Sequence, residues 1–176
     1  MIWWLLISNG LPEWLSEFSE AYSKEVGLPY TCNSRIECLS EQTIQNLKRS
    51  NCKTVYIGVE SGNNDVRKNL LNRFYSNGDI IDGFSRLKKA GIGTFSYNIV
   101  GFPFETREQM EETLKINKAI RPDHGAVFYF YPYPATKLYD ICKENDLLLS
   151  GEEAKKVSGY FERPAIKLAT WRVEDC

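Results

Sequence analysis

The amino-acid sequence predicts an α/β fold built from parallel βα units. Short apolar runs with strand character recur roughly 27 to 40 residues apart, and a segment with helical periodicity fills each gap. These runs are continuous rather than strictly alternating, which is typical of parallel strands covered on both faces. A strand, a helix and a further parallel strand in succession are almost always connected in the right-handed sense.

The N-terminal segments predict a strand, a helix and an extended segment. The apolar run at 2–7 is too short to cross a bilayer and lacks the basic start and cleavage site of a signal peptide, so it predicts a buried strand. Apolar residues at helical spacing predict a helix over 12–22, with Pro12 in its first turn and Gly27 as a left-handed cap after its end. Residues 28–36 then predict an extended segment.

The central segments predict a helix and a second strand. Ser40 is a suitable N-cap, and Leu39 and Ile44 occupy the two positions of a hydrophobic staple. Residues 53–59, rich in Val, Ile and Tyr, predict the strand that follows this helix. A polar loop with short helical character is expected over 62–73.

The same alternation continues toward the C-terminus. A helix around 80–87 should end at Gly91, and a strand is expected over 94–100. Thr106 and Gln109 have the spacing of a capping box, which predicts the start of the next helix.

The last βα unit leads into a segment with little pattern. A strand is predicted over 126–131, followed by a turn at 132–134 and a helix that ends near Asn145. Residues 149–176 have weak periodicity, and we expect them to form a poorly defined C-terminal extension.

Residues 1–148 therefore predict a partial, open TIM-type barrel that is truncated on its N-terminal side. A closed eight-stranded barrel of βα units needs about 250 residues, which is more than this chain offers. An open sheet edge at 2–7 would be unusual in a native protein, so we expect the chain to continue upstream in its parent. The same edge makes a dimer through the sheet plausible.

Composition and charge narrow the classes of partner. The chain has 176 residues and a formal net charge of −1, with acids and bases interspersed, so we expect neither a nucleic-acid footprint nor membrane binding. An RNA substrate stays open, because another part of a longer protein could contact it. The five cysteines are irregularly spaced and form neither a CxxC nor a CxxxCxxC group, which predicts a reducing, cytoplasmic location without structural disulfides.

Polar side chains follow the predicted strands, where ligands bind in parallel α/β proteins. A carboxylate and an arginine at these ends suit the ammonium and carboxylate groups of an amino acid. Each has a structural explanation as well: Glu60 could cap a helix through the Gly62 amide region, and Arg35 could form a surface ion pair. The polar ends comprise Asn33, Ser34, Arg35 and Glu37, then Glu60, Ser61 and Gly62, then Tyr97 and Asn98 with Gly101-Phe102-Pro103 and Glu105-Thr106, and finally Tyr129, Tyr131 and Tyr133.

The ordered segments from Glu13 to about Leu148 resemble the radical S-adenosylmethionine (SAM) superfamily. The resemblance is greatest to the branch that often has an N-terminal cobalamin-binding domain and includes anaerobic magnesium-protoporphyrin monomethyl ester cyclases, which are Fe–S oxidoreductases. No single motif is specific, but the ordered set is. The matching segments are Glu13-Trp14-Leu15, Leu28-Pro29-Tyr30-Thr31-Cys32-Asn33-Ser34-Arg35, Tyr56-Ile57-Gly58-Val59-Glu60-Ser61-Gly62-Asn63, Leu70-Leu71-Asn72-Arg73, Ala90-Gly91-Ile92, Tyr97-Asn98-Ile99-Val100-Gly101-Phe102-Pro103 with Glu105-Thr106, and Phe130-Tyr131-Pro132-Tyr133-Pro134-Ala135-Thr136.

The resemblance implies roles for residues in the SAM site. Glu60, with Ser61 beside it, stands where the superfamily has a polar contact to the ribose or methionyl part of SAM. Arg73 resembles the arginine that pairs with the methionine carboxylate, and Asn33 and Arg35 lie on a strand that supplies another polar contact.

The resemblance assigns the later strands too. Tyr97 stands where many relatives have an acid, and Asn98 beside it is a candidate to replace that acid. Val100, next to Gly101, lies near the expected adenine site. Tyr129 and Tyr131 should face the substrate, and these tyrosines suit an aromatic or apolar one.

Two departures qualify the resemblance. The CxxxCxxC motif that binds the 4Fe–4S cluster and the glycine-rich segment for the methionyl amine lie upstream in the family, and neither occurs here. We therefore expect the chain alone to be inactive, with no metal ligands of its own. Glycine is usual in the family where Phe104 and Ala135 stand.

In the whole enzyme, the resemblance implies that a 4Fe–4S cluster on an upstream loop reduces bound SAM, which yields a 5′-deoxyadenosyl radical that abstracts a substrate hydrogen. Cobalamin is a further cofactor in some relatives. The upstream half of the barrel and a small-molecule substrate are the expected partners. The substrate is not determined, because methyl transfer, methylthiolation, ring formation and rearrangement all occur on this scaffold.

Two other functions compete with this interpretation. The chain could be a non-catalytic α/β half-barrel that binds a small molecule or a partner. It could instead be an unrelated, complete α/β enzyme that uses Glu60 or Glu37 as a general base, which would require a perturbed carboxylate in a closed pocket.

Overall fold

The computed structural model describes residues 4–7, 12–157 and 163–168. The strands are β1 (Trp4–Ile7), β2 (Tyr30–Ser34), β3 (Cys52–Glu60), β4 (Gly93–Val100) and β5 (His124–Tyr129). The helices are α1 (Pro12–Glu25), α2 (Glu41–Arg49), α3 (Asn77–Lys89), α4 (Arg107–Ile120), α5 (Lys137–Glu144) and α6 (Gly151–Lys155). A 3₁₀ turn, η1 (Ile36–Cys38), and a π-helical turn, η2 (Val66–Leu70), complete the list.

The strands form one sheet in the order β1-β2-β3-β4-β5, and the sheet does not close in the part of the chain that the structure describes. Strand β2 pairs in parallel with β1 and with β3. A helix or helical turn separates each strand from the next along the chain. The predicted α/β fold, an open array of βα units, is therefore confirmed.

The chain divides into two compact units, which we describe separately. Unit 1 comprises Met1–Val59, Tyr75–Tyr97 and Ile116–Ala126, and unit 2 comprises Glu60–Phe74, Asn98–Lys115 and Val127–Cys176.

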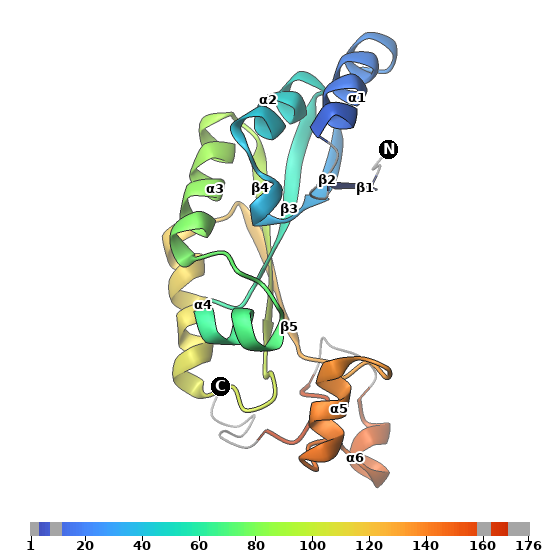
Figure 1. Cartoon of the computed structure of the whole chain (residues 1–176), viewed down its shortest axis with the longest axis vertical. Coiled ribbons are helices and arrows are strands. Elements are labelled where there is room, and N and C mark those ends of the chain that lie inside the picture. The colour runs from blue at the N-terminus through green and yellow to red at the C-terminus, as the bar shows by residue number, and fades with distance from the viewer. Residues whose placement is uncertain (1–3, 8–11, 158–162, 169–176) are drawn as a thin grey trace. The chain divides into compact units, whose positions relative to one another are not determined.

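Unit 1 is built around an apolar core between strands and helices. Along β3, Val55, Ile57 and Val59 are fully buried, whereas the residues between them are half-buried, as expected for a strand whose side chains alternate between two faces. Helices α1, α2 and α3 pack side by side in this unit (Figure 1). Their contributions to the core include Leu15, Ile44, Leu47, Ile80, Phe84 and Leu87.

The helix ends of unit 1 follow the signals in the sequence. The Ser40 hydroxyl accepts the amide N–H of Thr43 at 3.1 Å, and both staple residues, Leu39 and Ile44, are buried. Gly27 has a φ of +61° and donates its amide to the Tyr22 carbonyl at 2.8 Å, which ends α1 with a left-handed cap. The predicted caps are confirmed.

Unit 2 has a smaller core of its own, formed around loops as well as helices. The core includes Val66, Phe102, Phe130, Cys142, Leu147 and Ile166. The predicted capping box is present: the Thr106 amide donates to Gln109 at 2.9 Å, and the Gln109 amide donates to the Thr106 hydroxyl at 3.3 Å. Part of the C-terminal segment that the sequence left unplaced contributes to this core, because Ile166 forms an antiparallel bridge with Leu148.

Strand β5 differs from the prediction at both of its ends. Strand β5 spans His124–Tyr129 rather than 126–131. The strand begins with the polar His124 and with Gly125, where a Cβ atom would come within 2.7 Å of the Ser96 hydroxyl, so its first two residues lack the apolar character that predicts a strand. Among the described residues, no helix is long and apolar enough to span a membrane.

Candidate functional site

Glu60 ends β3 in a strained conformation. Its φ is +64°, in the left-handed region that costs a residue with a Cβ roughly 1–2 kcal/mol. Strain of this kind persists only where the surroundings over-determine it, and it is concentrated at functional sites. Glu60 is half-buried, and the buried Ser61 follows it directly.

The loop after Glu60 is fixed against α4 within unit 2. The Gly62 amide donates to the Thr113 hydroxyl at 2.8 Å, and the Asn63 side-chain amide donates to Glu112 at 3.0 Å. A Cβ atom on Gly62 would lie 2.2 Å from the Glu112 carbonyl oxygen, so only glycine fits. The Gly62 amide is therefore bound by Thr113.

Arg67 lies in the π-helical turn of the same loop and is completely buried. Its guanidinium donates to the Ser61 carbonyl at 2.5 Å and to the side-chain oxygen of Asn64. Its own carbonyl accepts the amide of Arg73 at 2.9 Å. Sequence analysis missed Arg67, because nothing in a polar loop distinguishes a buried arginine from a solvated one.

A second loop, after β4, is organised by Glu105. Its carboxylate accepts the amides of Gly101 at 2.6 Å and Phe102 at 3.1 Å. Burial raises the pKa of Glu105 to about 7, although both backbone hydrogen bonds act to lower it. Phe104 in this loop has a φ of +64°, which agrees with the glycine that the family resemblance led us to expect there.

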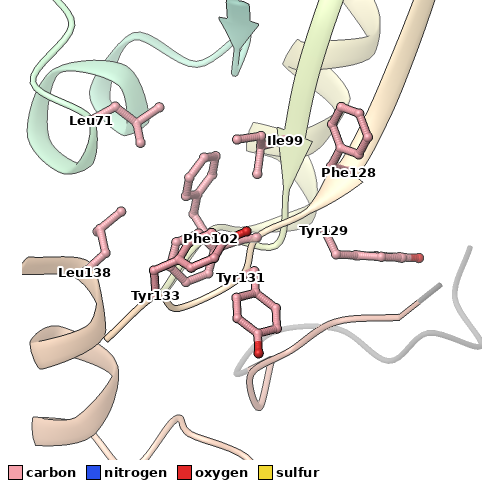
Figure 2. Close-up of a pocket in the computed structure, with 9 residues that line it drawn as sticks. Leu71, Ile99, Phe102, Phe128, Tyr129, Tyr131, Tyr133 and Leu138 are labelled. Atoms are coloured by element: carbon pink, nitrogen blue, oxygen red, sulfur yellow. The ribbon is translucent and has the colours of Figure 1, made fainter. Parts of the chain in front are cut away.

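An apolar pocket of about 330 Å³ lies in unit 2 (Figure 2). The rings of Phe102 and Phe130 are 5.4 Å apart between centroids, and those of Tyr131 and Tyr133 are 5.0 Å apart. The pocket is therefore suited to an uncharged, flat or aliphatic group. Its walls are formed by Leu71, Ile99, Phe102, Phe128, Tyr129, Phe130, Tyr131, Tyr133 and Leu138.

Two predicted site residues line this pocket. Tyr129 and Tyr131 line it, and in Figure 2 their hydroxyl groups point away from Leu71. Val100 lies between two lining residues in sequence, and its carbonyl accepts the Phe130 amide at 2.8 Å. Leu71, two residues before Arg73, brings the Glu60–Arg73 loop to the pocket wall.

Other predicted site residues belong to unit 1. Asn33 lies on β2 in register with Tyr56 on β3. Arg35 follows the end of β2 and donates to Glu37 at 2.6 Å in a partly exposed ion pair. These placements do not test the expected contacts of Asn33 and Arg35 with SAM, which stay predictions.

Tyr97 and Asn98 lie on opposite faces of β4, since neighbouring strand residues alternate. Within unit 1, the Tyr97 ring is 5.8 Å from that of Tyr56 and 4.9 Å from that of Phe95. Burial, and next the nearby Tyr56, raise the pKa of Tyr97. Asn98 belongs to the buried series on the other face and is only 2% exposed.

An open α/β sheet of βα units, with an apolar pocket lined by residues of unit 2, is an architecture that binds small molecules. The sequence model of the radical SAM superfamily matches residues 10–116. The chain belongs to this superfamily.

Two curated relatives agree with that membership. An uncharacterised methyltransferase of Pyrococcus horikoshii is 33% identical over 129 residues, which cover 72% of this chain and 28% of the relative. A tRNA-2-methylthio-N(6)-dimethylallyladenosine synthase of Staphylococcus haemolyticus is 31% identical over 118 residues, covering 64% of this chain and 23% of the relative. The chain spans about a quarter of the length of these relatives.

Solved structures share the fold. The radical SAM methyltransferase TsrM of Kitasatospora setae, with cobalamin and a [4Fe-4S] cluster bound, matches with a TM-score of 0.65 at 14% identity over 85% of this chain and 29% of its own. The Elp3 protein of Methanocaldococcus infernus matches with a TM-score of 0.67 at 20% identity over 86% of this chain and 42% of its own. These likenesses confirm the predicted partial barrel of βα units.

The cofactors of the superfamily fit the described residues unequally. For SAM, unit 2 offers a carboxylate at a strand end, an arginine and an apolar pocket, which together match its polar and apolar parts. For a 4Fe–4S cluster, no three His, Cys, Asp or Glu residues of the described chain gather where they could hold metal.

Two of the described cysteines are in contact with each other. The sulfur atoms of the buried Cys32 and Cys52 are 3.8 Å apart, and their contact, followed by burial, raises the pKa of the Cys32 thiol. A 4Fe–4S cluster is held by more cysteines than this pair offers.

Proposed function

We propose that this chain forms the C-terminal part of a radical SAM enzyme barrel and that unit 2 provides contacts to SAM and to an apolar substrate. The observation that supports this proposal is the gathering of three elements in one unit. Glu60 ends a strand in a strained conformation. Backbone hydrogen bonds hold the loop that follows it, the last of them between the Arg73 amide and the Arg67 carbonyl. Leu71 of that loop lines the apolar pocket.

The chemistry of each group fits a part of SAM. The Glu60 carboxylate can accept hydrogen bonds from ribose hydroxyls or from the methionyl ammonium, and the Arg73 guanidinium can bind a carboxylate through two parallel hydrogen bonds. The loop from Val100 to Phe102 supports the adenine, with Glu105 fixing its amides. When bound, SAM supplies the reactive adenosyl or methyl group, and these residues orient it and exclude water.

The substrate side lies at the tyrosines of the pocket. Tyr129 and Tyr131 present aromatic surface to an apolar group of the substrate, and their hydroxyls can serve its polar edge. The relatives named above include a methyltransferase and a methylthio-group synthase. Their names support transfer of a one-carbon unit, as methyl or methylthio, as the reaction of the parent enzyme.

The remaining cofactors belong to the parent protein in this proposal. Ligands for a 4Fe–4S cluster come from an upstream segment of the same barrel, and cobalamin, where it is used, comes from a further domain. The chain alone is accordingly inactive in the reductive cleavage of SAM. Formation of 5′-deoxyadenosine by this chain after iron–sulfur reconstitution would contradict that statement.

Calorimetric titration with SAM tests the site. The chain should bind SAM weakly, and Arg73→Ala should lower the affinity at least about tenfold, since hydrogen bonds to charged groups contribute about 1.5–3 kcal/mol. Glu60→Gln should weaken binding as well. Arg107→Ala is a matched control, because Arg107 is an exposed arginine of unit 2 that pairs with Glu111.

The same titration separates this proposal from the alternative of a non-catalytic small-molecule binder. Equal SAM affinity in the wild-type chain and the Arg73→Ala variant, or no SAM binding at all, would contradict the proposed role of unit 2. Binding of an apolar probe such as indole to the pocket without SAM binding would favour the alternative.

A further inference from the structure

Arg67 is the largest of the completely buried side chains in the described part of the protein. It lies in the π-helical turn Val66–Leu70 of unit 2. Turns of this kind are rare and occur frequently at functional sites. Burying a guanidinium is costly unless hydrogen bonds compensate, so its partners indicate what the arginine does.

The side chain of Arg67 holds the segment that follows Glu60. One terminal nitrogen donates to the carbonyl of Ser61, and the other donates to the side-chain oxygen of Asn64. The planar guanidinium fixes two acceptors at once, in a set geometry. Ser61 directly follows Glu60, so the two guanidinium hydrogen bonds of Arg67 fix the backbone that directs the Glu60 carboxylate.

The main chain of Arg67 holds the other end of the loop. Its amide donates to the Asn63 carbonyl at 3.2 Å, and its carbonyl accepts the Arg73 amide at 2.9 Å. One buried residue is therefore hydrogen-bonded both to the backbone next to Glu60 and to the backbone of Arg73.

We infer that Arg67 is a positioning residue that sets the placement of the Glu60 carboxylate relative to the Arg73 guanidinium in the SAM site. The inference rests on the proposed function of unit 2. Arg67 itself touches no ligand, because it exposes no surface. Removing Arg67 also takes a donor from the buried Ser61 carbonyl, so the test must separate SAM affinity from the free energy of unfolding.

The test compares SAM affinity and thermal unfolding in variants of the full chain. Arg67→Met keeps the side-chain volume and removes both guanidinium hydrogen bonds. Arg67→Lys keeps the charge but cannot hold both acceptors in the same geometry. Both variants should remain folded by circular dichroism and bind SAM about fivefold to tenfold more weakly than wild type. Arg86→Met, which removes a unit 1 arginine that also donates to a main-chain carbonyl, should leave the affinity unchanged.

A double-mutant cycle with Arg73→Ala shows whether Arg67 acts through Arg73. In that background, Arg67→Met should change the affinity by less than about twofold, because the group being positioned is gone. An equal loss in both backgrounds would overturn the inference, as would wild-type affinity in folded Arg67→Met. If neither Arg67 variant folds, the arginine serves the fold and the positioning role is wrong. If the wild-type chain does not bind SAM, the proposed function itself fails.

Discussion

Among the described residues of unit 1, the buried polar side chains are all uncharged, such as Asn46, Ser50 and Ser96, whereas unit 2 buries the charged residues Arg67 and Glu105. Among the described residues, left-handed backbone outside glycine is also more frequent in unit 2. It occurs there at Glu60, Asn72, Phe104, Ala135 and Asp146, and in unit 1 at Asn51 and Arg121.

This difference separates two tasks. Unit 1 encloses the larger apolar core, which supports the fold in proportion to the apolar area it buries. Unit 2 contains strained backbone and buried charge, which cost free energy and are concentrated where a protein holds a ligand. The predictions below test this division, from the largest expected effect to the smallest.

The largest effect is expected at Gly62. Gly62→Ala places a Cβ atom within 2.2 Å of the Glu112 carbonyl oxygen, so the loop must separate from α4. We expect a loss of about 3 kcal/mol in the free energy of unfolding, measured by urea denaturation. Gly83→Ala in α3 of unit 1 is the control: its Cβ would have ordinary contacts at 3.5 Å or more, and the change should be neutral or stabilising. Equal losses in the free energy of unfolding for the two substitutions would contradict the close contact between the Gly62 loop and α4.

Glu105 should make stability depend on pH near neutrality. Its pKa rises from an ordinary 4.5 to about 7 on folding, so the folded chain binds more protons in this interval. The free energy of unfolding should therefore fall as pH rises from about 4.5 to about 7, by on the order of 2 kcal/mol from this residue.

Urea unfolding of Glu105→Gln between pH 5 and pH 8 checks this expectation, because the substitution should remove most of the decline. Glu108→Gln, an exposed neighbour whose pKa is lowered, chiefly by its backbone hydrogen bond, should leave the decline intact. A wild-type chain whose stability does not change over this pH range would contradict the placement of a buried carboxyl at Glu105.

A smaller effect of opposite sign is expected at Ala135. This exposed residue has a φ of +66°, so Ala135→Gly relieves left-handed strain and should stabilise the protein by about 0.5 kcal/mol after the entropy of the added glycine is subtracted. The same substitution at Ala90, which has a φ of −75° at the end of α3, should destabilise by about 1 kcal/mol. Thermal unfolding of both variants shows whether the signs differ as expected.

The smallest effect is expected at Arg35. Its ion pair with Glu37 is partly exposed, and such pairs contribute about 0.5 kcal/mol or less. Arg35→Gln should leave urea unfolding nearly unchanged. A loss above about 2 kcal/mol would show that Arg35 has a structural role that the ion pair does not explain.

Much of unit 1 could be predicted from the sequence because it obeys local rules. The apolar periodicity of α1 and α3, the N-cap at Ser40 and the left-handed glycine at Gly27 are set by residues within a few positions of one another. The boundary error in β5 arose where the decisive contact, between Gly125 and Ser96, joins residues far apart in sequence.

Unit 2 was predicted less completely for the same reason. Glu60, Arg73 and Tyr131 were assigned to the site through the family resemblance, and these assignments stay predictions; of the three, only Tyr131 lines the pocket. Arg67 was missed, and Glu105 was placed at a strand end without its burial being predicted, because whether a charged side chain is buried depends on partners that sequence spacing does not reveal.

The central claim, that unit 2 contains a SAM-binding rim, is tested most directly by amide chemical-shift mapping of the ¹⁵N-labelled chain during titration with SAM. The account predicts that the changing signals belong to Glu60–Asn64, Arg73 and Gly101–Phe102, and that signals from α1 and α2 stay constant. Changes confined to α1 and α2, or an unchanged spectrum at high SAM concentration, would contradict it.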